Sequence, residues 1–190
     1  MLYVEGARDR DIMRAWSYRL LAKQASRVFR TAVILGGRQP ARAIDHFSRL
    51  EAGARGLCVL DRDDGSAAAT ESAAEGGLEF FTWSRRHIES YLLVPSALHR
   101  ALRISSDDGR LGRLLATHLP PDGDEEAYRA LNAKRFLAPG GELARGLDRP
   151  IPLGSVARAT RTEELHLDVH TLFDRLRDGL GVSSAPVVIR

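Results

Sequence analysis

The stretch LYVEGARDRD, residues 2–11, runs from three apolar residues directly into Glu5 and Gly6, and Asp9 follows four residues after Glu5. A short, unbroken apolar run is typical of a strand that is buried on both faces of a parallel sheet. The sequence therefore predicts a buried strand whose carboxyl end carries acidic side chains.

A second stretch, GLCVLDRDDG at residues 56–65, has the same organisation. Another apolar run ends here in Asp61, and Asp63 follows two residues later. In sheets of parallel strands, functional groups collect outside the carboxyl ends of the strands. If these two strands belong to one parallel sheet, their carboxylates lie at the same edge.

The segments between these two strands favour a parallel sheet. Apolar residues at a spacing of four predict a helix over residues 9–25, and TAVILGG at residues 31–37 is another short apolar run, ended by glycines. Residues 40–53 have a helical pattern with Pro40 near the first turn. The order strand, helix, strand, helix, strand predicts an α/β fold with right-handed crossovers.

Further strand and helix signals follow the third strand. The small and polar segment at residues 65–77 predicts a loop, and LEFFTWS at residues 78–84 has the aromatic content of a fourth strand. The stretch RHIESYLLVP at residues 86–95 predicts the start of a helix that is stopped by Pro95. Glu89 is therefore expected just past another strand end.

The remainder of the chain has a mainly helical pattern. It includes an amphipathic segment near residues 162–178. We expect a parallel sheet flanked by helices at residues 1–95. A helical extension at residues 96–190 is expected to complete the domain.

Composition and charge limit the classes of function. The chain has 190 residues and a formal net charge of +3, but residues 1–60 hold 11 Arg or Lys against 5 Asp or Glu. This amino-terminal excess of positive charge suits a polyanionic partner. The sequence has no apolar run near the roughly 18 residues of a membrane span and no signal peptide. With a single cysteine, Cys58, the chain is expected to be soluble and cytoplasmic.

Carboxylates from three predicted strand ends suggest a metal site. Like charges in one cleft repel each other unless a cation lies among them, and oxygen-only ligation points to Mg²⁺ or Mn²⁺. Divalent ions held in this way suit phosphoryl transfer. Each carboxylate, taken singly, can equally be a solvated cap. The candidates are Glu5, Asp9, Asp61, Asp63 and Glu89.

These motifs resemble a known domain. A strand ending in Glu-Gly, an Asp four residues after the Glu, and a strand ending in Asp-x-Asp about 55 residues later resemble a TOPRIM domain, over roughly residues 2–95. The stretch RRHIESYLL at residues 85–93 is similar to the OLD (overcoming lysogenization defect) family of nucleases. In that family the TOPRIM domain follows an ABC-type ATPase domain and nicks or cleaves DNA with two divalent ions. The resemblance implies a metal-dependent endonuclease that acts on DNA.

The resemblance also implies a role for each carboxylate. Glu5 and Asp9 would bind or position one ion, Asp61 and Asp63 would bind the other, and Glu89 would support the site. The ions would be Mg²⁺ or Mn²⁺. An ATPase domain and any oligomer contacts would belong to a longer polypeptide, from which this chain is expected to be a piece.

Two basic residues qualify the resemblance. Arg8 stands where the family often has Ser, so the resemblance implies no hydroxyl role at that position. Lys134, in LNAKRFLAPGGEL, matches the basic residue that the family's nucleases carry in a later helical segment. It would stabilise charge that develops on the phosphate. A solvated lysine is the alternative interpretation.

Other functions are open at this point. Arginines such as Arg8, Arg85 and Arg86 are candidates for phosphate contact, and the same domain could bind nucleic acid without cutting it. A phosphoacceptor domain with Asp61 as acceptor fits less well, because the sheet starts on Glu5 rather than on an acidic pair. No phosphate-binding G-x-x-x-x-G-K-[ST] motif occurs, so ATP hydrolysis by this chain alone is not expected.

Overall fold

The computed structural model describes residues 1–21, 27–62, 76–105 and 107–181. The chain divides into two compact units, which we call the sheet unit and the helical unit. The sheet unit comprises Met1–Trp83 and His166–Arg190, and the helical unit comprises Ser84–Leu165. The chain leaves the sheet unit after Trp83 and returns to it with the last helix, which packs against the first helix and the sheet.

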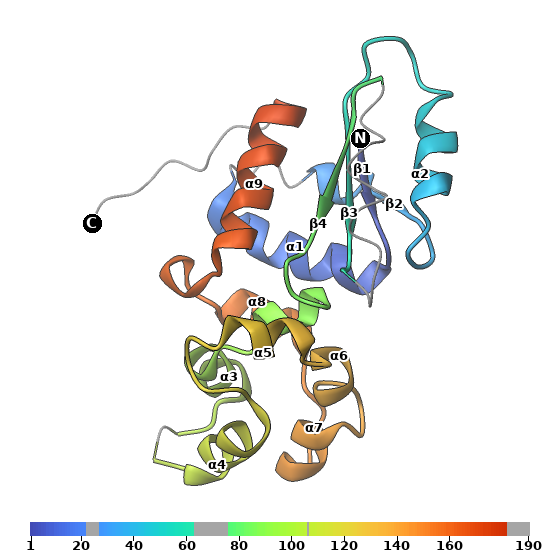
Figure 1. Ribbon diagram of the computed structural model, residues 1–190. Helices are drawn as coiled ribbons and strands as arrows, with labels where there is room; N and C mark the ends of the chain where they lie inside the picture. The colour runs from blue at the N-terminus through green and yellow to red at the C-terminus, as the bar shows by residue number, and fades with distance from the viewer. Residues whose placement is uncertain (22–26, 63–75, 106, 182–190) are drawn as a thin grey trace, which may run out of the picture. The chain divides into compact units, whose positions relative to one another are not determined.

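The sheet unit is built on four parallel strands (Figure 1). Its elements are β1 (Leu2–Val4), α1 (Ala7–Leu20), β2 (Val33–Ile34), α2 (Pro40–Phe47), β3 (Gly56–Leu60), β4 (Leu78–Thr82) and α9 (Leu167–Leu180). The strand order is β2-β1-β3-β4, and Val4 pairs with Ile34 on one side and with Val59 on the other. The predicted α/β fold with a parallel sheet and flanking helices is confirmed.

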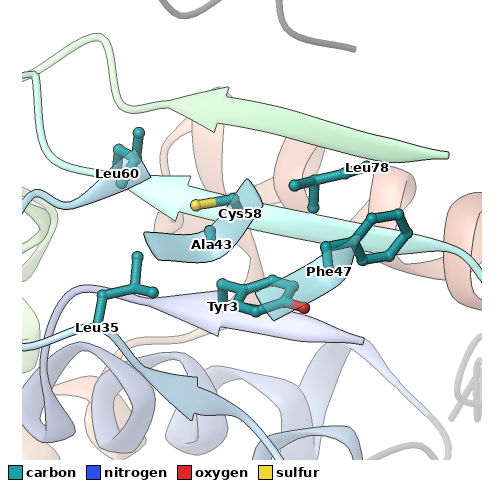
Figure 2. Close-up of a cluster of buried hydrophobic side chains, with 7 residues drawn as sticks. All are labelled: Tyr3, Leu35, Ala43, Phe47, Cys58, Leu60 and Leu78. Carbon is teal, nitrogen blue, oxygen red and sulfur yellow. The ribbon is translucent and has the colours of Figure 1, made fainter. Parts of the chain in front are cut away.

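Helix α2 covers one face of the sheet (Figure 1). Alternate residues of a strand point to the same face, so this face receives Tyr3 from β1, and Cys58 and Leu60 from β3. They pack against Ala43 and Phe47 of α2, as Figure 2 shows. The packing of this face of the sheet therefore depends on the apolar side of α2, a short helix. Its Phe47 side chain lies over the amino-terminal end of β3.

Helices α1 and α9 lie on the opposite side of the sheet (Figure 1). Buried residues at helical spacing form the apolar side of each helix: Ile12, Met13 and Trp16 in α1, and Val169, Leu172, Phe173 and Leu176 in α9. The ring of Trp16 meets that of Trp83 edge to face, with centroids 6.3 Å apart. Because helices cover both faces, all five residues of β3 are buried.

Helix α9 also reaches the outer strand of the described sheet. The Arg175 Nη1 donates to the Phe80 carbonyl oxygen at 3.3 Å, and its guanidinium lies 5.5 Å from the centre of the Phe81 ring. The Trp83 N–H donates to the Leu60 carbonyl oxygen. Alternate residues of a parallel strand bond to alternate sides. The Phe80 carbonyl therefore points away from β3, and it accepts the hydrogen bond from Arg175.

The helical unit contains only short helices among its described residues. They are the 3₁₀ helix η4 (Ile88–Leu92), α3 (Pro95–Leu102), α4 (Gly109–His118), α5 (Glu125–Ala130), α6 (Ala133–Phe136), α7 (Glu142–Leu147), α8 (Leu153–Ala159) and η5 (Thr162–Glu164). The helix start predicted at residues 86–95 is the short 3₁₀ helix η4, which ends at Leu92, and Pro95 then begins the next helix, α3. Proline suits a first helical turn, where its missing N–H would have no partner within the helix.

A charged cluster joins two parts of the helical unit. Arg100 of α3 donates to the Ala159 carbonyl oxygen at the end of α8 and to the Glu164 carboxylate. The same carboxylate accepts hydrogen bonds from Ser96 and from the Arg161 N–H. Partial burial favours the neutral acid, yet these hydrogen bonds and the Arg100 charge lower the pKa of Glu164 to about 2.

The helices of the structure also bear on membrane association. Among the described residues, no helix combines the length and the apolar character that a membrane crossing requires.

The segment predicted as a loop at residues 65–77 lies outside the described residues except for its last two positions.

The close contact between β3 and α2 predicts that Gly56→Ala destabilises the sheet unit. A Cβ at Gly56 would lie 2.7 Å from the Phe47 ring and 2.9 Å from a Leu78 methyl group. Overpacking of this kind costs about 1–3 kcal/mol. Urea unfolding followed by tryptophan fluorescence tests it, since Trp16 and Trp83 both belong to the sheet unit.

Gly179→Ala in α9 is the matched control. No described atom lies within 4 Å of a Cβ at Gly179, so the free energy of unfolding should stay unchanged or rise by up to about 1 kcal/mol. Equal midpoints for Gly56→Ala and wild type would contradict the packing described between β3 and α2.

The lowered pKa of Glu164 predicts an acid-dependent loss of stability in the helical unit. The pKa is depressed below its ordinary value of 4.5, so the stabilisation is complete above that pH and declines as the pH falls toward about 2. Glu164→Gln should therefore lower the melting temperature at pH 7 and change it little near pH 2. Glu163→Gln, at an exposed neighbouring position, should be neutral at both. A pH-independent effect of Glu164→Gln would refute the assignment.

Candidate functional site at the carboxyl ends of the strands

Polar side chains come from the loops that follow three adjacent strands. Glu5 follows β1, Asp61 follows β3, and Arg38 lies four residues after β2. The chain runs from β1 to β2 in one direction and then to β3 and β4 in the other, so the order switches between β1 and β3. Ligands in open α/β sheets bind outside the carboxyl ends of the strands at such a switch point. Glu5 and Asp61 flank this position.

Glu5 connects the ends of three strands. Its Oε1 accepts a hydrogen bond from the Asp61 N–H at 2.7 Å, which joins the ends of β1 and β3. Its carbonyl oxygen accepts the N–H groups of Gly36 and Gly37, at 2.9 and 3.0 Å, from the turn after β2. Both glycines have positive φ, 84° and 121°, which a residue with a Cβ rarely adopts. The glycine pair thus lets the β2 loop reach Glu5.

Arg38 also lies at this edge of the sheet, and the sequence alone did not identify it. Its Nη1 donates to the Asp61 carbonyl oxygen. Because β1 lies between β2 and β3, the loop after β2 and this side chain together span the end of β1 to reach Asp61. The available sequence signal was an arginine directly after the Gly-Gly that ends the second apolar run, at the same sheet edge as the carboxylates.

The pKa of the Cys58 thiol depends on its burial and on two nearby charges. Burial raises its pKa to about 12, the negative charge of Glu5 acts in the same direction, and the Arg38 cation opposes it. The thiol is therefore protonated at neutral pH and is not a nucleophile. The opposed effects place a carboxylate and a guanidinium within electrostatic range of the same buried strand residue.

Asp9 has a local structural contact. Its Oδ2 accepts the Gly6 N–H at 2.7 Å, at the beginning of α1. Such a contact satisfies a backbone N–H that has no partner within the helix, and a carboxylate here also suits the helix dipole. A Cβ at Gly6 would lie 3.3 Å from the same oxygen, so a larger residue here would require the Asp9 side chain to shift slightly.

The donor set at the strand ends suits a hard cation in chemical type. Glu5 and Asp61 contribute carboxylate oxygens from neighbouring strands, as Mg²⁺ and Mn²⁺ prefer. Within the described ranges, no three His, Cys, Asp or Glu side chains form a group that could hold a metal ion. The predicted further ligand, Asp63, lies outside the described residues.

Two predicted site residues belong to the helical unit. Glu89 lies in η4 with its side chain buried. Lys134 lies on the short helix α6 and is exposed. Their roles in the site stay predictions of the TOPRIM resemblance, because the structure does not place the two units relative to each other.

Arg85, a candidate for phosphate contact, is engaged inside the helical unit. Its guanidinium forms a two-pronged pair with Glu125, at 2.9 and 2.8 Å, and donates to the Ser90 carbonyl oxygen. It also lies over the rings of Tyr128 and Tyr91, 4.6 and 5.3 Å from their centres. The side chain is only 12% exposed. These contacts give Arg85 a structural role that the sequence did not reveal.

Comparisons of the chain with protein-family models, with curated proteins and with solved structures found no match in any of the three. The TOPRIM resemblance and the assignment to the OLD family therefore stay predictions.

The contacts of Arg85 predict that Arg85→Ala destabilises the helical unit. The change removes charged hydrogen bonds to Glu125, each worth about 1.5–3 kcal/mol at such partly buried sites. Thermal unfolding followed by circular dichroism measures the loss.

Arg135→Ala is the control, because that side chain is 78% exposed and lies 3.7 Å from Glu142. Exposed pairs contribute about 1 kcal/mol or less. If Arg85→Ala melts at the same temperature as Arg135→Ala, Arg85 is not the structural residue that its contacts indicate.

Proposed function

We propose that this chain is a TOPRIM-type endonuclease module that uses Mg²⁺ or Mn²⁺ to nick or cleave DNA. The observation that carries the proposal is the pairing of Glu5 and Asp61 at the switch point of a parallel sheet, joined by the 2.7 Å hydrogen bond. Strand-end carboxylates at such a point are chemically suited to a divalent ion. The motif resemblance supplies the reaction class.

The proposed ligands come from both sides of the switch point. Glu5, with Asp9, would hold one cation, and Asp61, with Asp63, would hold a second. Such ions activate a water for attack on phosphorus and stabilise the leaving oxygen. Glu5 would additionally fix the backbone of Asp61, which orients that ligand before any ion binds. Glu89 and Lys134 would support the site, as the resemblance implies.

Positive charge on the sheet unit supports a polyanionic substrate. The first 60 residues carry 11 Arg or Lys against 5 Asp or Glu. Arg8 is exposed in the first turn of α1, three residues after Glu5, and so lies close in sequence to the proposed metal ligands. Arginine binds phosphate oxygens through a planar fork of donors, which suits a nucleic-acid backbone. We propose DNA as the substrate and an ABC-type ATPase domain as the partner.

A non-catalytic nucleic-acid-binding module is the second candidate. The Asp9 contact favours it, because an oxygen that satisfies the Gly6 N–H serves the local backbone whether or not chemistry takes place. In that case the carboxylates would order the strand ends, and DNA would bind without being cut.

Removal of a single carboxylate charge tests the proposal. Glu5→Gln keeps an oxygen that can accept the Asp61 N–H, and Asp61→Asn keeps the size of the side chain, so both variants should fold. With supercoiled plasmid and Mg²⁺ or Mn²⁺, wild type should nick the DNA and both variants should lose at least about 10²-fold in rate, on the scale of one lost transition-state contact. EDTA should abolish the wild-type activity.

Thermal melting with Mn²⁺ tests the metal site independently of activity. A ligand at 100 times its Kd stabilises the folded state by about 2.7 kcal/mol, and the two variants should lose most of this gain. Asp45→Asn is the control, because Asp45 pairs with Arg49 on the exposed side of α2. DNA binding without cleavage would favour the second candidate. No stabilisation of wild type by Mn²⁺ would contradict the proposed metal site.

A further inference from the structure

Arg38 makes a contact between strands that are not neighbours. It lies between the Gly36–Gly37 turn and α2, and its side chain is half-buried. Its Nη1 donates to the carbonyl oxygen of Asp61, beyond the end of β1. A long, permanently charged side chain is thus hydrogen-bonded to the backbone of a proposed metal ligand.

Both sides of the Asp61 backbone are fixed by charged side chains. The N–H donates to Glu5 Oε1 at 2.7 Å, and the carbonyl oxygen accepts from Arg38. Hydrogen bonds to ionised groups are stronger than those between neutral groups. Asp61 cannot rotate about its backbone without breaking one of them. The direction in which its carboxylate leaves the chain is therefore set by Glu5 and Arg38 together.

The charge of Arg38 also matters at this position. Glu5 and Asp61 bring carboxylates to adjacent strand ends, and Asp61 is only 5% exposed. Two negative groups held close together destabilise each other unless a positive group lies nearby. A guanidinium bonded to Asp61 supplies that positive group within the chain, so the ligand geometry can persist before a cation arrives.

Arg42 provides an internal comparison. It belongs to α2, and its Nη1 donates to the Leu35 carbonyl oxygen at 2.7 Å. Arg42 therefore makes the same kind of bond as Arg38 from the same part of the chain, but to the end of β2. The two bonds have different targets, because the Arg38 bond is made to Asp61, beside the switch point.

We propose that Arg38 is a positioning residue, which orients the Asp61 carboxylate for a divalent cation by holding the Asp61 carbonyl oxygen opposite the Glu5–Asp61 bond. The inference rests on the proposed function, because it concerns a ligand of the proposed metal site. Residues that orient metal ligands typically change metal affinity by 10–100-fold when they are removed.

The test compares Arg38→Ala, Arg38→Lys and Arg42→Ala with wild type. Metal affinity is taken from the Mn²⁺ dependence of the melting temperature, with the metal-free melting temperature as the measure of folding. Arg38→Ala should require about 10–100-fold more Mn²⁺ for the same stabilisation, and Arg38→Lys should recover part of the affinity because an ammonium can donate to the same carbonyl. Arg42→Ala should bind Mn²⁺ like wild type. If Arg38→Ala does not fold, Arg38→Gln takes its place.

Amide hydrogen exchange at Asp61, measured by NMR without metal or DNA, separates this inference from the proposed function. Exchange should be about fivefold faster in Arg38→Ala than in wild type or Arg42→Ala, as expected for the loss of roughly 1 kcal/mol. Wild-type Mn²⁺ affinity in Arg38→Ala would overturn the positioning role and leave the nuclease proposal standing. If wild type itself binds no Mn²⁺, the proposed function fails, and unchanged exchange at Asp61 would then overturn the Arg38 inference as well.

Discussion

The hydrogen bond from the Asp61 N–H to the Glu5 carboxylate is the constraint on which the strand-end site depends. This bond joins β1 and β3, the two strands between which the strand order changes direction. It lies just past Val4 and Val59, the last residues paired between these strands. The same glutamate accepts the N–H groups of the glycine turn after β2 through its own carbonyl. One residue therefore connects the three loops that follow β1, β2 and β3.

The sequence was sufficient to predict the sheet because its information is local. Short apolar runs at β1 and β3 are buried on both sides, and helical periodicity lies between them, so the parallel arrangement follows. The division into units was not predictable in the same way. Helix α9 joins the sheet unit through contacts with elements that are more than a hundred residues earlier in the chain. Pro95 marked the end of one helical segment, η4, but not the start of the next, because a proline suits the first turn of a helix as well as the position after its end.

The site was predictable where a side chain immediately follows a strand. Glu5 and Asp61 come together because the ends of parallel strands meet at one edge. Arg38 was missed because its contact is not local: the residue follows β2, but it bonds a carbonyl 23 positions later, after β3. Arg85 shows the converse. Its basic character suggested a phosphate ligand, whereas Glu125, 40 positions later, and two tyrosines give it partners within its own unit.

The contact of Arg175 with the outer strand has a consequence for how the chain behaves among copies of itself. An outer strand presents backbone groups that can pair with a strand from another molecule, which is a common route to aggregation. Arg175 donates a hydrogen bond to the Phe80 carbonyl on that side of β4 and places a charge beside the Phe81 ring. An incoming strand would have to displace that bond and bury a cation. Helix α9 thus packs against the sheet and also hinders the pairing of β4 with a strand from another molecule.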